Sequence, residues 1–333
     1  MSEDGWDALL PAMFASAGIG TGLRFKVTPL TGGVSSDIVR IQLEDGRQFC
    51  AKRALSQLKV ATEWKAPLER NQYEIAWLRR ASSIVPGAAP AVLAEDREHG
   101  IALLDYLPAD DYLLWKSELL AGRADPAVPV AVADVLGRIH AATLNDAAVA
   151  AEFPTDHLID ALRLDPYLRF TASRHPDLAS RILGVLDTTA ATKCALVHGD
   201  VSPKNILVAK QDGHPVLLDA ECAWYGDPAF DAAFCLNHLV LKAVHLPHLA
   251  DELRSQAKAF AATWLAHFPQ DMQADLDRRT AALLPCLMLA RVDGKSPVEY
   301  LTAASQQVVR DLAMPRIAEP RDTVEQVIEE AKP

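Results

Sequence analysis

The sequence has 333 residues, of which 50% are hydrophobic and 23% are charged, which suits two globular lobes and excludes disordered chains, collagen-like repeats and disulfide-stapled miniproteins. Its 33 basic and 44 acidic residues give a formal net charge of −11, which disfavours a nucleic-acid partner and leaves room for a cationic or neutral substrate. The chain has no apolar run of ~18 residues, no basic signal-peptide start and no C-x-x-C pair, so we expect a cytoplasmic protein with reduced thiols, no membrane partner and a monomeric or homodimeric state.

The first part of the chain predicts a small antiparallel sheet with one helix. Short runs of apolar and β-branched residues predict strands at 24–30, 37–43, 47–52, 91–96 and 101–107. The Glu-Asp-Gly sequence at 44–46 is a tight hairpin signal, and a helix is expected over 66–82, with Pro67 near its start. These elements predict an N-terminal lobe over residues 1–104, followed by a linker over 105–108.

The rest of the chain, residues 109–333, predicts a larger and mostly helical lobe. Apolar residues at helical spacing mark segments at 110–121, 129–144, 177–190, 228–245, 248–267, 272–290 and 297–313. Short β-type runs interrupt them at 195–200, 205–210 and 216–221, and the last two predict a β-hairpin. The predicted fold class is therefore α+β, with a sheet-rich lobe and a helical lobe that contains one hairpin.

Polar side chains gather around this predicted hairpin. Asp200 leaves the first β-type run and enters a loop, Asn205 follows five residues later, and Asp219 ends the last run. A hairpin folds these side chains onto one patch. One carboxylate can accept a hydroxyl proton, while the amide oxygen and the second carboxylate supply hard oxygen ligands for Mg²⁺. Phosphoryl transfer needs this combination, because its catalysis is mostly positioning and charge neutralisation.

The spacing H-G-D-x-x-x-x-N followed by L-D-x-E resembles the motif of the aminoglycoside phosphotransferase and choline kinase superfamily, relatives of protein kinases. The resemblance covers nearly the whole chain and implies a bilobal protein-kinase-like fold that uses ATP and Mg²⁺. It implies that Asp200 is the catalytic base and that Asn205 and Asp219 are metal ligands. It also implies that His198 packs beneath the loop and that Asp231 bonds the backbone of the catalytic loop.

The N-terminal lobe offers matching candidates for nucleotide binding. The loop between the first two strands lies where kinases cover the ATP phosphates, although a plain hairpin turn also explains its sequence. Its candidate phosphate-binding residues are Gly32, Gly33, Ser35 and Ser36. Lys52 resembles the kinase lysine that holds the α- and β-phosphates. Its expected partner is Glu74, with Glu63 and Glu69 as less central alternatives. A surface ion pair would also explain Lys52 and Glu74. The linker resembles the kinase hinge, where backbone groups of Asp105 and Leu107 would bond adenine.

The acceptor site is predicted from the pattern D-x-E-x-A-x-Y-G-x-x-x-F-D, which is similar to that of methylthioribose kinases and, more loosely, of choline kinases. This similarity implies that Glu221, Trp224 and Tyr225 line or border the acceptor pocket. Arg291 lies in a segment that is similar to an arginine-rich stretch of methylthioribose kinases and would face the substrate or the transferring phosphate. Arg291 is equally explained as a helix C-terminal residue, with Gly294 as the stop signal.

The function predicted from these residues is ATP-dependent transfer of a phosphoryl group to a hydroxyl of a small metabolite, such as a sugar or an amino alcohol. One alternative is an aminoglycoside-type antibiotic phosphotransferase, for which Glu221 and Asp227 would help to form an acidic acceptor pocket. A second alternative is a catalytically silent nucleotide-binding scaffold. It is disfavoured because the base, the metal ligands and Lys52 are all present.

Overall fold

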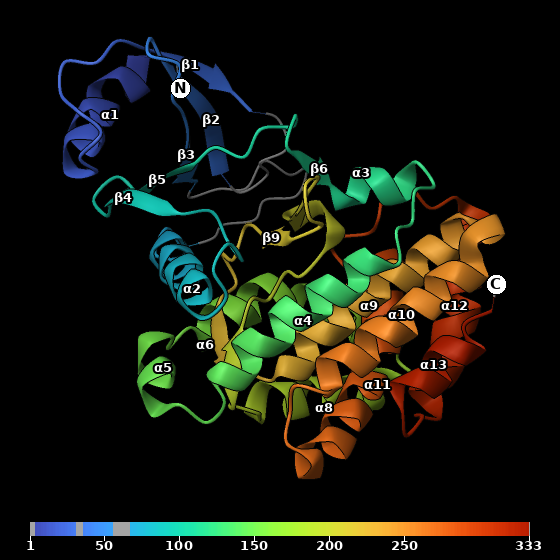
Figure 1. Cartoon of the computed structure of the whole chain (residues 1–333). Helices are drawn as coiled ribbons and strands as arrows, with labels where there is room; N and C mark the ends of the chain where they lie inside the picture. Colours follow the sequence, from blue (N-terminus) through green and yellow to red (C-terminus); the bar gives the residue numbers. More distant parts are fainter. Residues whose placement is uncertain (1–3, 31–35, 56–66, 333) are drawn as a thin grey trace. The chain divides into compact units, whose positions relative to one another are not determined.

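The computed structural model describes residues 4–30, 36–55 and 67–332. The chain forms two compact units, Met1–Asp111 and Tyr112–Pro333 (Figure 1). The boundary lies just beyond the predicted linker at 105–108. Four of the predicted candidates lie outside the described residues, namely Gly32, Gly33, Ser35 and Glu63.

The N-terminal unit is built on the predicted antiparallel sheet, with the strand order β1-β2-β3-β5-β4. The strands are β1 (Phe25–Pro29), β2 (Ser36–Leu43), β3 (Gln48–Ala54), β4 (Val92–Asp96) and β5 (Ile101–Asp105). The predicted helix is confirmed as α2 (Arg70–Ile84). The hairpin between β2 and β3 is also confirmed, and Gly46 in its turn has a φ of 91°, which glycine adopts without steric cost.

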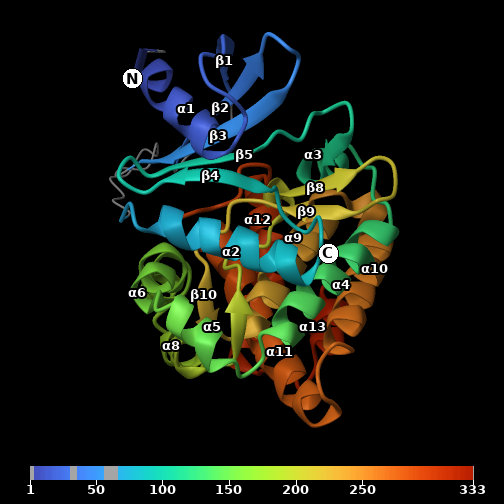
Figure 2. The ribbon, with the colours of Figure 1, turned by 60° about the vertical axis from the view of Figure 1, so that its left-hand side comes forward.

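The sequence patterns do not predict the first helix, α1 (Asp4–Ser16). α1 lies against one face of the sheet (Figure 2). Its side chains in the core there are Trp6, Leu10, Met13 and Phe14. Ala51 of β3 belongs to the same core, so its neighbour Lys52 points to the opposite face, where it meets α2. An exposed Pro11 inside α1 masks the helical signal.

The C-terminal unit is organised around α9 (Pro228–His245), in which every residue from Pro228 to Val244 is buried. The helices that match predicted segments are α4 (Ala127–Ala142), α8 (Ala179–Ala191), α9, α10 (Ala250–Leu265), α11 (Gln270–Asp293) and α12 (Ala303–Ala318). Within the described residues, no single helix is long and apolar enough to cross a membrane. Only α9 and Pro247–Leu265 taken together reach that length and composition, as a pair bent by 117°. The burial of α9 explains its apolar composition.

Short strands frame the polar loop of this unit. The three β-type runs are confirmed as β7 (Ala195–Val197), β8 (Ile206–Ala209) and β9 (Pro215–Leu217), and β8 and β9 form the predicted hairpin. The expected helix over 110–121 is wrong at its start, because β6 (Tyr112–Leu114) pairs with β8 before α3 (Trp115–Leu120) begins. β10 (Trp224–Gly226) pairs with β7 and is also not predicted. Pairing between segments far apart in the chain here overrides local propensity.

A stretch without predicted elements, residues 145–176, holds short helical segments. They are α5 (Ala147–Glu152), α6 (Asp156–Ile159), η1 (Asp160–Arg169) and α7 (Phe170–Arg174). η1 is a π-helix with Pro166 inside it. A π-helix has a wider turn than an α-helix, so its apolar residues do not follow the usual spacing. The last helix, α13 (Val324–Glu330), is also missed, although Thr323 and Gln326 form a capping box at its start.

Candidate active site

The loop that follows β7 is held from below by Asp231 of α9. The carboxylate of Asp231 accepts hydrogen bonds from the backbone N–H groups of His198, at 2.7 Å, and Gly199, at 2.8 Å. Both Asp231 and His198 are completely buried. The predicted role of Asp231 is therefore confirmed. The carboxylate fixes the loop because it satisfies two buried donors at once.

Two further side chains orient Asp231. Trp264 donates its indole N–H to Nδ1 of His140 at 3.0 Å, so the proton of a neutral His140 lies on Nε2. Nε2 lies 3.2 Å from the Asp231 carboxylate and donates to it. This chain from α10 through α4 to α9 was not predicted. Its members lie far apart in the sequence, and a lone histidine in an apolar helix carries no local signal.

His198 links the loop to the hairpin. Its Nδ1 accepts a hydrogen bond from the Asp200 backbone N–H at 3.1 Å, and its Nε2 lies 3.0 Å from the Leu218 carbonyl oxygen. Burial lowers the pKa of His198, which favours the neutral ring that this pair of contacts requires. The prediction that His198 packs beneath the loop is confirmed.

The hairpin brings Asn205 and Asp219 to one end. Asn205 immediately precedes β8, and its carbonyl accepts a hydrogen bond from the N–H of Leu218 at 2.8 Å, just before Asp219. The Asn205 side-chain nitrogen donates to the Asp200 carbonyl at 3.1 Å. Asp219 has a φ of 66°, which costs a non-glycine residue of order 1–3 kcal/mol and is common at functional sites. Hydrogen bonds thus join Asn205 to the Asp200 backbone and to Leu218, the residue before Asp219.

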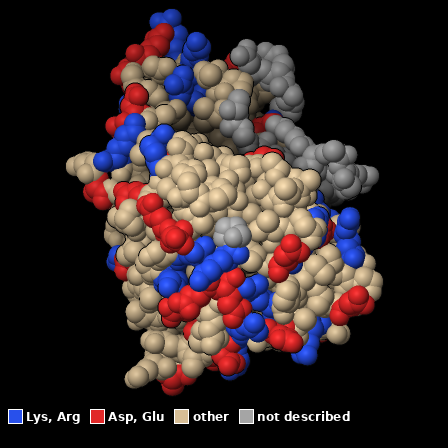
Figure 3. All heavy atoms as spheres, turned by 90° about the vertical axis from the view of Figure 1, so that its right-hand side faces the viewer, with Lys and Arg blue, Asp and Glu red and all other residues tan. Residues whose placement is uncertain are grey.

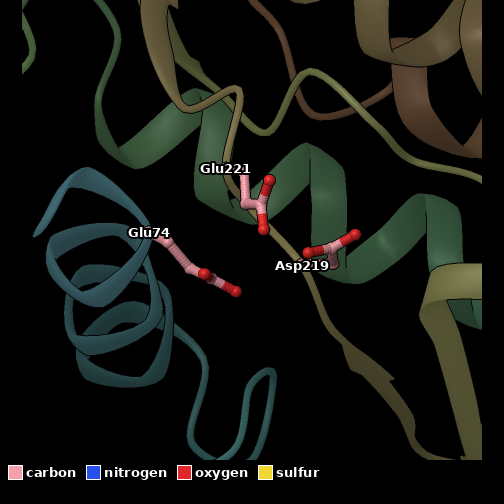
Figure 4. Close-up of side chains that lie close together, drawn as sticks. All are labelled: Glu74, Asp219 and Glu221. Carbon is pink, nitrogen blue, oxygen red and sulfur yellow. The ribbon is translucent and has the colours of Figure 1, made fainter. Parts of the chain in front are cut away.

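The donor set at this end of the hairpin fits a hard divalent cation. Carboxylate oxygens of Asp219 and Glu221 lie within 4.8 Å of each other, on the chain segment that follows β9 (Figure 4). The Asn205 amide nitrogen is already used as a donor, so its oxygen is the atom suited to a metal. Carboxylate and amide oxygens are the ligands that Mg²⁺ prefers. Glu221 was predicted for the acceptor pocket, but its position next to Asp219 suits the metal site better.

Two cations contact the Asp200 carboxylate. Arg163 Nη2 lies 2.8 Å and Lys204 Nζ lies 3.0 Å from Asp200 Oδ2. Burial opposes ionisation, but the positive charges of Lys204 and Arg163 outweigh it and lower the pKa of Asp200 to about 2. Asp200 is therefore a fixed carboxylate at neutral pH.

Arg163 is a site residue that the sequence did not reveal. Besides its contact with Asp200, its Nε donates to the Gly199 carbonyl at 2.8 Å and its Nη1 donates to the Leu162 carbonyl. It projects from the π-helix η1, and π-helical turns are frequent at functional sites. Pro166, in an otherwise helix-like sequence, is the signal that could have directed attention to this segment.

In the N-terminal unit, Lys52 of β3 pairs with Glu74 of α2 at 2.8 Å. Both side chains are buried, at 7% and 4% exposure, so a surface ion pair is excluded. The expected partner is therefore confirmed among the described candidates. Figure 4 also shows Glu74 projecting from its helix.

The predicted hinge residues lie at the end of β5, where Asp105 is the last residue of the strand, and just beyond it. The N–H of Asp105 donates to the Ala91 carbonyl at 3.0 Å, so this donor is already used within the sheet edge. Leu107 is half-buried in the segment that follows. Ser36, the first residue of β2, is buried at 1% exposure.

Comparisons with known proteins agree with this site. A family model described as the phosphotransferase enzyme family matches residues 26–274. The chain belongs to this family. This membership agrees with the predicted phosphotransferase class, and the family implies ATP and a divalent metal ion.

The relatives and solved structures that match this chain share little sequence identity with it. A methylthioribose kinase of Pectobacterium atrosepticum is 24% identical over 269 residues, which are 69% of this chain and 66%, slightly less than two thirds, of that protein. The structure of an ethanolamine kinase of Plasmodium vivax matches with a TM-score of 0.55 and 12% identity, covering 99% of this chain and 87% of that chain. A macrolide 2′-phosphotransferase of Brachybacterium faecium matches with a TM-score of 0.51 and 16% identity, covering 96% and 99%. The predicted protein-kinase-like fold is confirmed.

Two of the predicted acceptor candidates, Trp224 and Tyr225, form hydrogen bonds within the fold. The Trp224 side chain is fully buried, and its indole N–H donates to Asp156 at 2.5 Å. The Tyr225 hydroxyl bonds the carbonyl oxygens of Cys194, at 3.1 Å, and Thr143, at 3.3 Å. Cys194 precedes β7, at the end opposite the Asp200 loop. These contacts favour structural roles for Trp224 and Tyr225.

The Asp227 side chain also forms hydrogen bonds within the fold. It caps α9 by accepting the Ala229 N–H at 3.0 Å, as predicted, and it receives two hydrogen bonds from Arg279, at 3.0 and 3.2 Å. Its side chain is completely buried. The expectation that Asp227 contributes to an acidic acceptor pocket of an aminoglycoside-type enzyme is therefore wrong, because its carboxylate is already neutralised by Arg279.

Arg291 lies near the end of α11 and is only 9% exposed. Its Nη1 donates to the Tyr167 hydroxyl at 3.0 Å and to the Ser296 backbone and side-chain oxygens. Gly294 ends the helix, and a Cβ there would lie 2.4 Å from the Ala290 carbonyl oxygen. Arg291 thus occupies the predicted helix end, but its guanidinium turns into the interior of the unit and not toward solvent.

Proposed function

We propose that the protein transfers the γ-phosphoryl group of ATP to a hydroxyl of a small metabolite. The observation that carries this proposal is the arrangement of Asp200, Asn205 and Asp219 around hydrogen bonds from Asn205 to Asp200 and from Leu218 to Asn205, in a chain that belongs to a phosphotransferase family. Asp200 is buried, ionised and anchored through the His198 ring. It orients the acceptor hydroxyl and accepts its proton as the new O–P bond forms and the bond to ADP breaks.

The metal site in this proposal consists of Asn205, Asp219 and Glu221. When bound, Mg²⁺ neutralises the charge of the phosphates. The hairpin holds the ligands in place through the Leu218–Asn205 backbone hydrogen bond, at 2.8 Å. The strained backbone at Asp219 is consistent with a side chain placed for function.

The N-terminal unit is the nucleotide-binding lobe in this proposal, and the C-terminal unit holds the catalytic and acceptor sites. Lys52, oriented by Glu74, binds the α- and β-phosphates of ATP. Gly32, Gly33, Ser35 and Ser36 remain the candidates for phosphate binding in this proposal, and of these Ser36 lies within the described residues. The Asp105 carbonyl and the Leu107 backbone bond adenine, because the Asp105 N–H is already used by Ala91.

An ADP-release assay tests the proposal against the silent-scaffold alternative. Purified protein is incubated with ATP, Mg²⁺ and sugars, amino alcohols, hydroxy acids or aminoglycosides. We expect ADP formation that depends on one class of acceptor. If the protein bound ATP but formed no ADP with any class of acceptor, the silent nucleotide-binding scaffold would be supported.

Replacing Asp219 with alanine is expected to remove most of the Mg²⁺-dependent gain in ATP affinity, about tenfold or more, because one anionic ligand is lost. Affinity for ATP without Mg²⁺ should stay nearly unchanged. Calorimetric titration with and without Mg²⁺ measures both values. Asp187→Ala, an exposed change on α8, is the control. An Asp219→Ala protein with the full Mg²⁺ effect would remove Asp219 from the metal site.

Replacing Arg163 with glutamine is expected to lower kcat by about 10- to 100-fold, because the Asp200 carboxylate loses one of its two anchors and moves from its productive position. The KM for ATP should change little. Arg169→Gln is the matched control, since Arg169 lies on the same π-helix and pairs with Asp160 and Asp165 at the surface. Equal kcat values for the two variants would show that Arg163 has no role in positioning the base.

A further inference from the structure

A group of basic side chains lies inside the C-terminal unit, and we call Lys242, His238, Arg291 and Tyr300 the Lys242 cluster. Lys242 and His238 lie one turn apart on α9, and Arg291 lies near the end of α11. Lys242 is only 1% exposed, and its Nζ lies 3.5 Å from the centroid of the Tyr300 ring. A ring face attracts an ammonium group, but it supplies no negative charge equal to that of a carboxylate.

The basic groups of the Lys242 cluster have no carboxylate partner within the described part of the chain. No carboxylate there forms an ion pair with Lys242, and the nearby Glu299 pairs with Lys116. Burial and the charge of Lys116 lower the pKa of Lys242 to about 7, and Glu299 offsets only part of this effect. Burying an amine without a carboxylate partner is unfavourable, so this arrangement points to a ligand that supplies the missing charge.

The cluster also contains hydrogen-bond donors that the described residues do not use. The Tyr300 hydroxyl and the Arg291 Nε are buried and have no hydrogen-bond partner. Each buried donor left in this state costs about 1–3 kcal/mol. An ammonium, a guanidinium N–H and a phenol together form the kind of donor set that binds carboxylates and phosphates.

The Lys242 cluster is electrostatically linked to the catalytic loop. Burial holds the pKa of His238 well below its ordinary value, and the charges of Arg291, Lys242, Lys204 and Lys116 act in the same direction. Lys204 is the residue that contacts Asp200 at 3.0 Å. α9 also carries Asp231, which lies two turns before His238 and binds the backbone of the loop that holds Asp200. One helix, α9, therefore carries both the anchor of the loop with the proposed base and two members of the Lys242 cluster.

The face of the molecule drawn in Figure 3 shows no excess of basic side chains. On the face drawn in Figure 3, acidic and basic side chains are intermingled, and the whole chain carries a net charge of −11. A buried positive group in an acidic protein is thus a local feature of this region and does not reflect the composition of the chain.

We propose that the Lys242 cluster binds an anionic group of the acceptor, a carboxylate or a phosphate, while the acceptor hydroxyl lies at Asp200. This inference rests on the proposed kinase function and narrows its substrate class to acidic hydroxyl compounds. It disfavours choline-like amino alcohols and aminoglycosides, because their positive charges would be repelled by the same side chains.

Calorimetric titration with matched probes tests this inference. The protein is saturated with ADP and Mg²⁺, which occupy the nucleotide site, and titrated with D-glycerate, glycerol 3-phosphate or neutral glycerol. We expect the preferred anion to bind at least about tenfold more tightly than glycerol, because charged hydrogen bonds are the stronger ones. The two anions distinguish a carboxylate site from a phosphate site. Equal affinity for all three probes would overturn the inference.

Lys242→Met should reduce the preference for the anion to within about twofold of glycerol. Its melting temperature should not fall, because methionine fills the same space without a buried charge. Lys193→Met is the matched control, since Lys193 also lies over an aromatic ring, at 4.3 Å from Trp224, but pairs with Asp156. A Lys242→Met protein that melts lower and retains the full anion preference would show a merely structural lysine.

Binding of ATP with Mg²⁺ is measured on the same samples. If the wild-type protein did not bind ATP with Mg²⁺, the proposed kinase function itself would be contradicted. ATP binding without any preference for the anions would contradict only the acidic-acceptor inference. The two failures are therefore distinguishable.

Discussion

Replacing Asp200 with asparagine is expected to lower kcat by at least about 10²- to 10⁴-fold while ATP still binds in the presence of Mg²⁺. An amide cannot accept the hydroxyl proton. It would also leave Arg163 and Lys204 without the anion that both contact. Nucleotide binding should persist, because the proposed metal ligands and the Lys52–Glu74 pair are unchanged.

Steady-state turnover and calorimetric ATP titration on the same preparation check this result. Asp212→Asn is the matched control, because Asp212 lies in the exposed turn of the same hairpin and its side chain accepts a hydrogen bond from the His214 N–H at 3.0 Å. It should keep nearly full turnover. If Asp200→Asn also kept it with a confirmed acceptor, Asp200 would not be the base.

Replacing Asp231 with alanine is expected to destabilise the C-terminal unit by about 3–5 kcal/mol, because each buried donor left without an acceptor costs about 1–3 kcal/mol. The backbone N–H groups of His198 and Gly199 would lose their shared acceptor, and His140 would lose the carboxylate at its Nε2. The three donors are buried, so water cannot replace the carboxylate without opening the fold. The loop that carries Asp200 would lose its anchor at the same time.

Urea unfolding measures this loss as a change in the free energy of unfolding. Asp251→Ala is the control, because Asp251 is 95% exposed in the first turn of α10 and its pair with Arg254 lies at the surface. It should change stability by less than about 1 kcal/mol. A comparable small change for Asp231→Ala would mean that the loop is held by other contacts.

The sequence alone was sufficient to predict the elements whose signals are local. The strands of the N-terminal sheet are marked by short runs of apolar and β-branched residues, and the hairpin turn is marked by three residues. The structure confirms both. Asp200, Asn205 and Asp219 could be grouped because a single loop and hairpin connect them. The Lys52–Glu74 pair could be anticipated because the family resemblance placed the lysine at a strand end and the glutamate within a helix.

Only the tertiary structure decided which distant side chains complete the site. Arg163 reaches Asp200 from a π-helix whose periodicity is not that of an α-helix, and Lys242 meets Tyr300 across long chain separation. Proximity in sequence was misleading for Trp224 and Tyr225, because pairing of β10 with β7 commits both side chains to buried hydrogen bonds. Net charge was equally uninformative about the acceptor site. Electrostatics inside a protein depend on which groups are buried together, and only folding determines that.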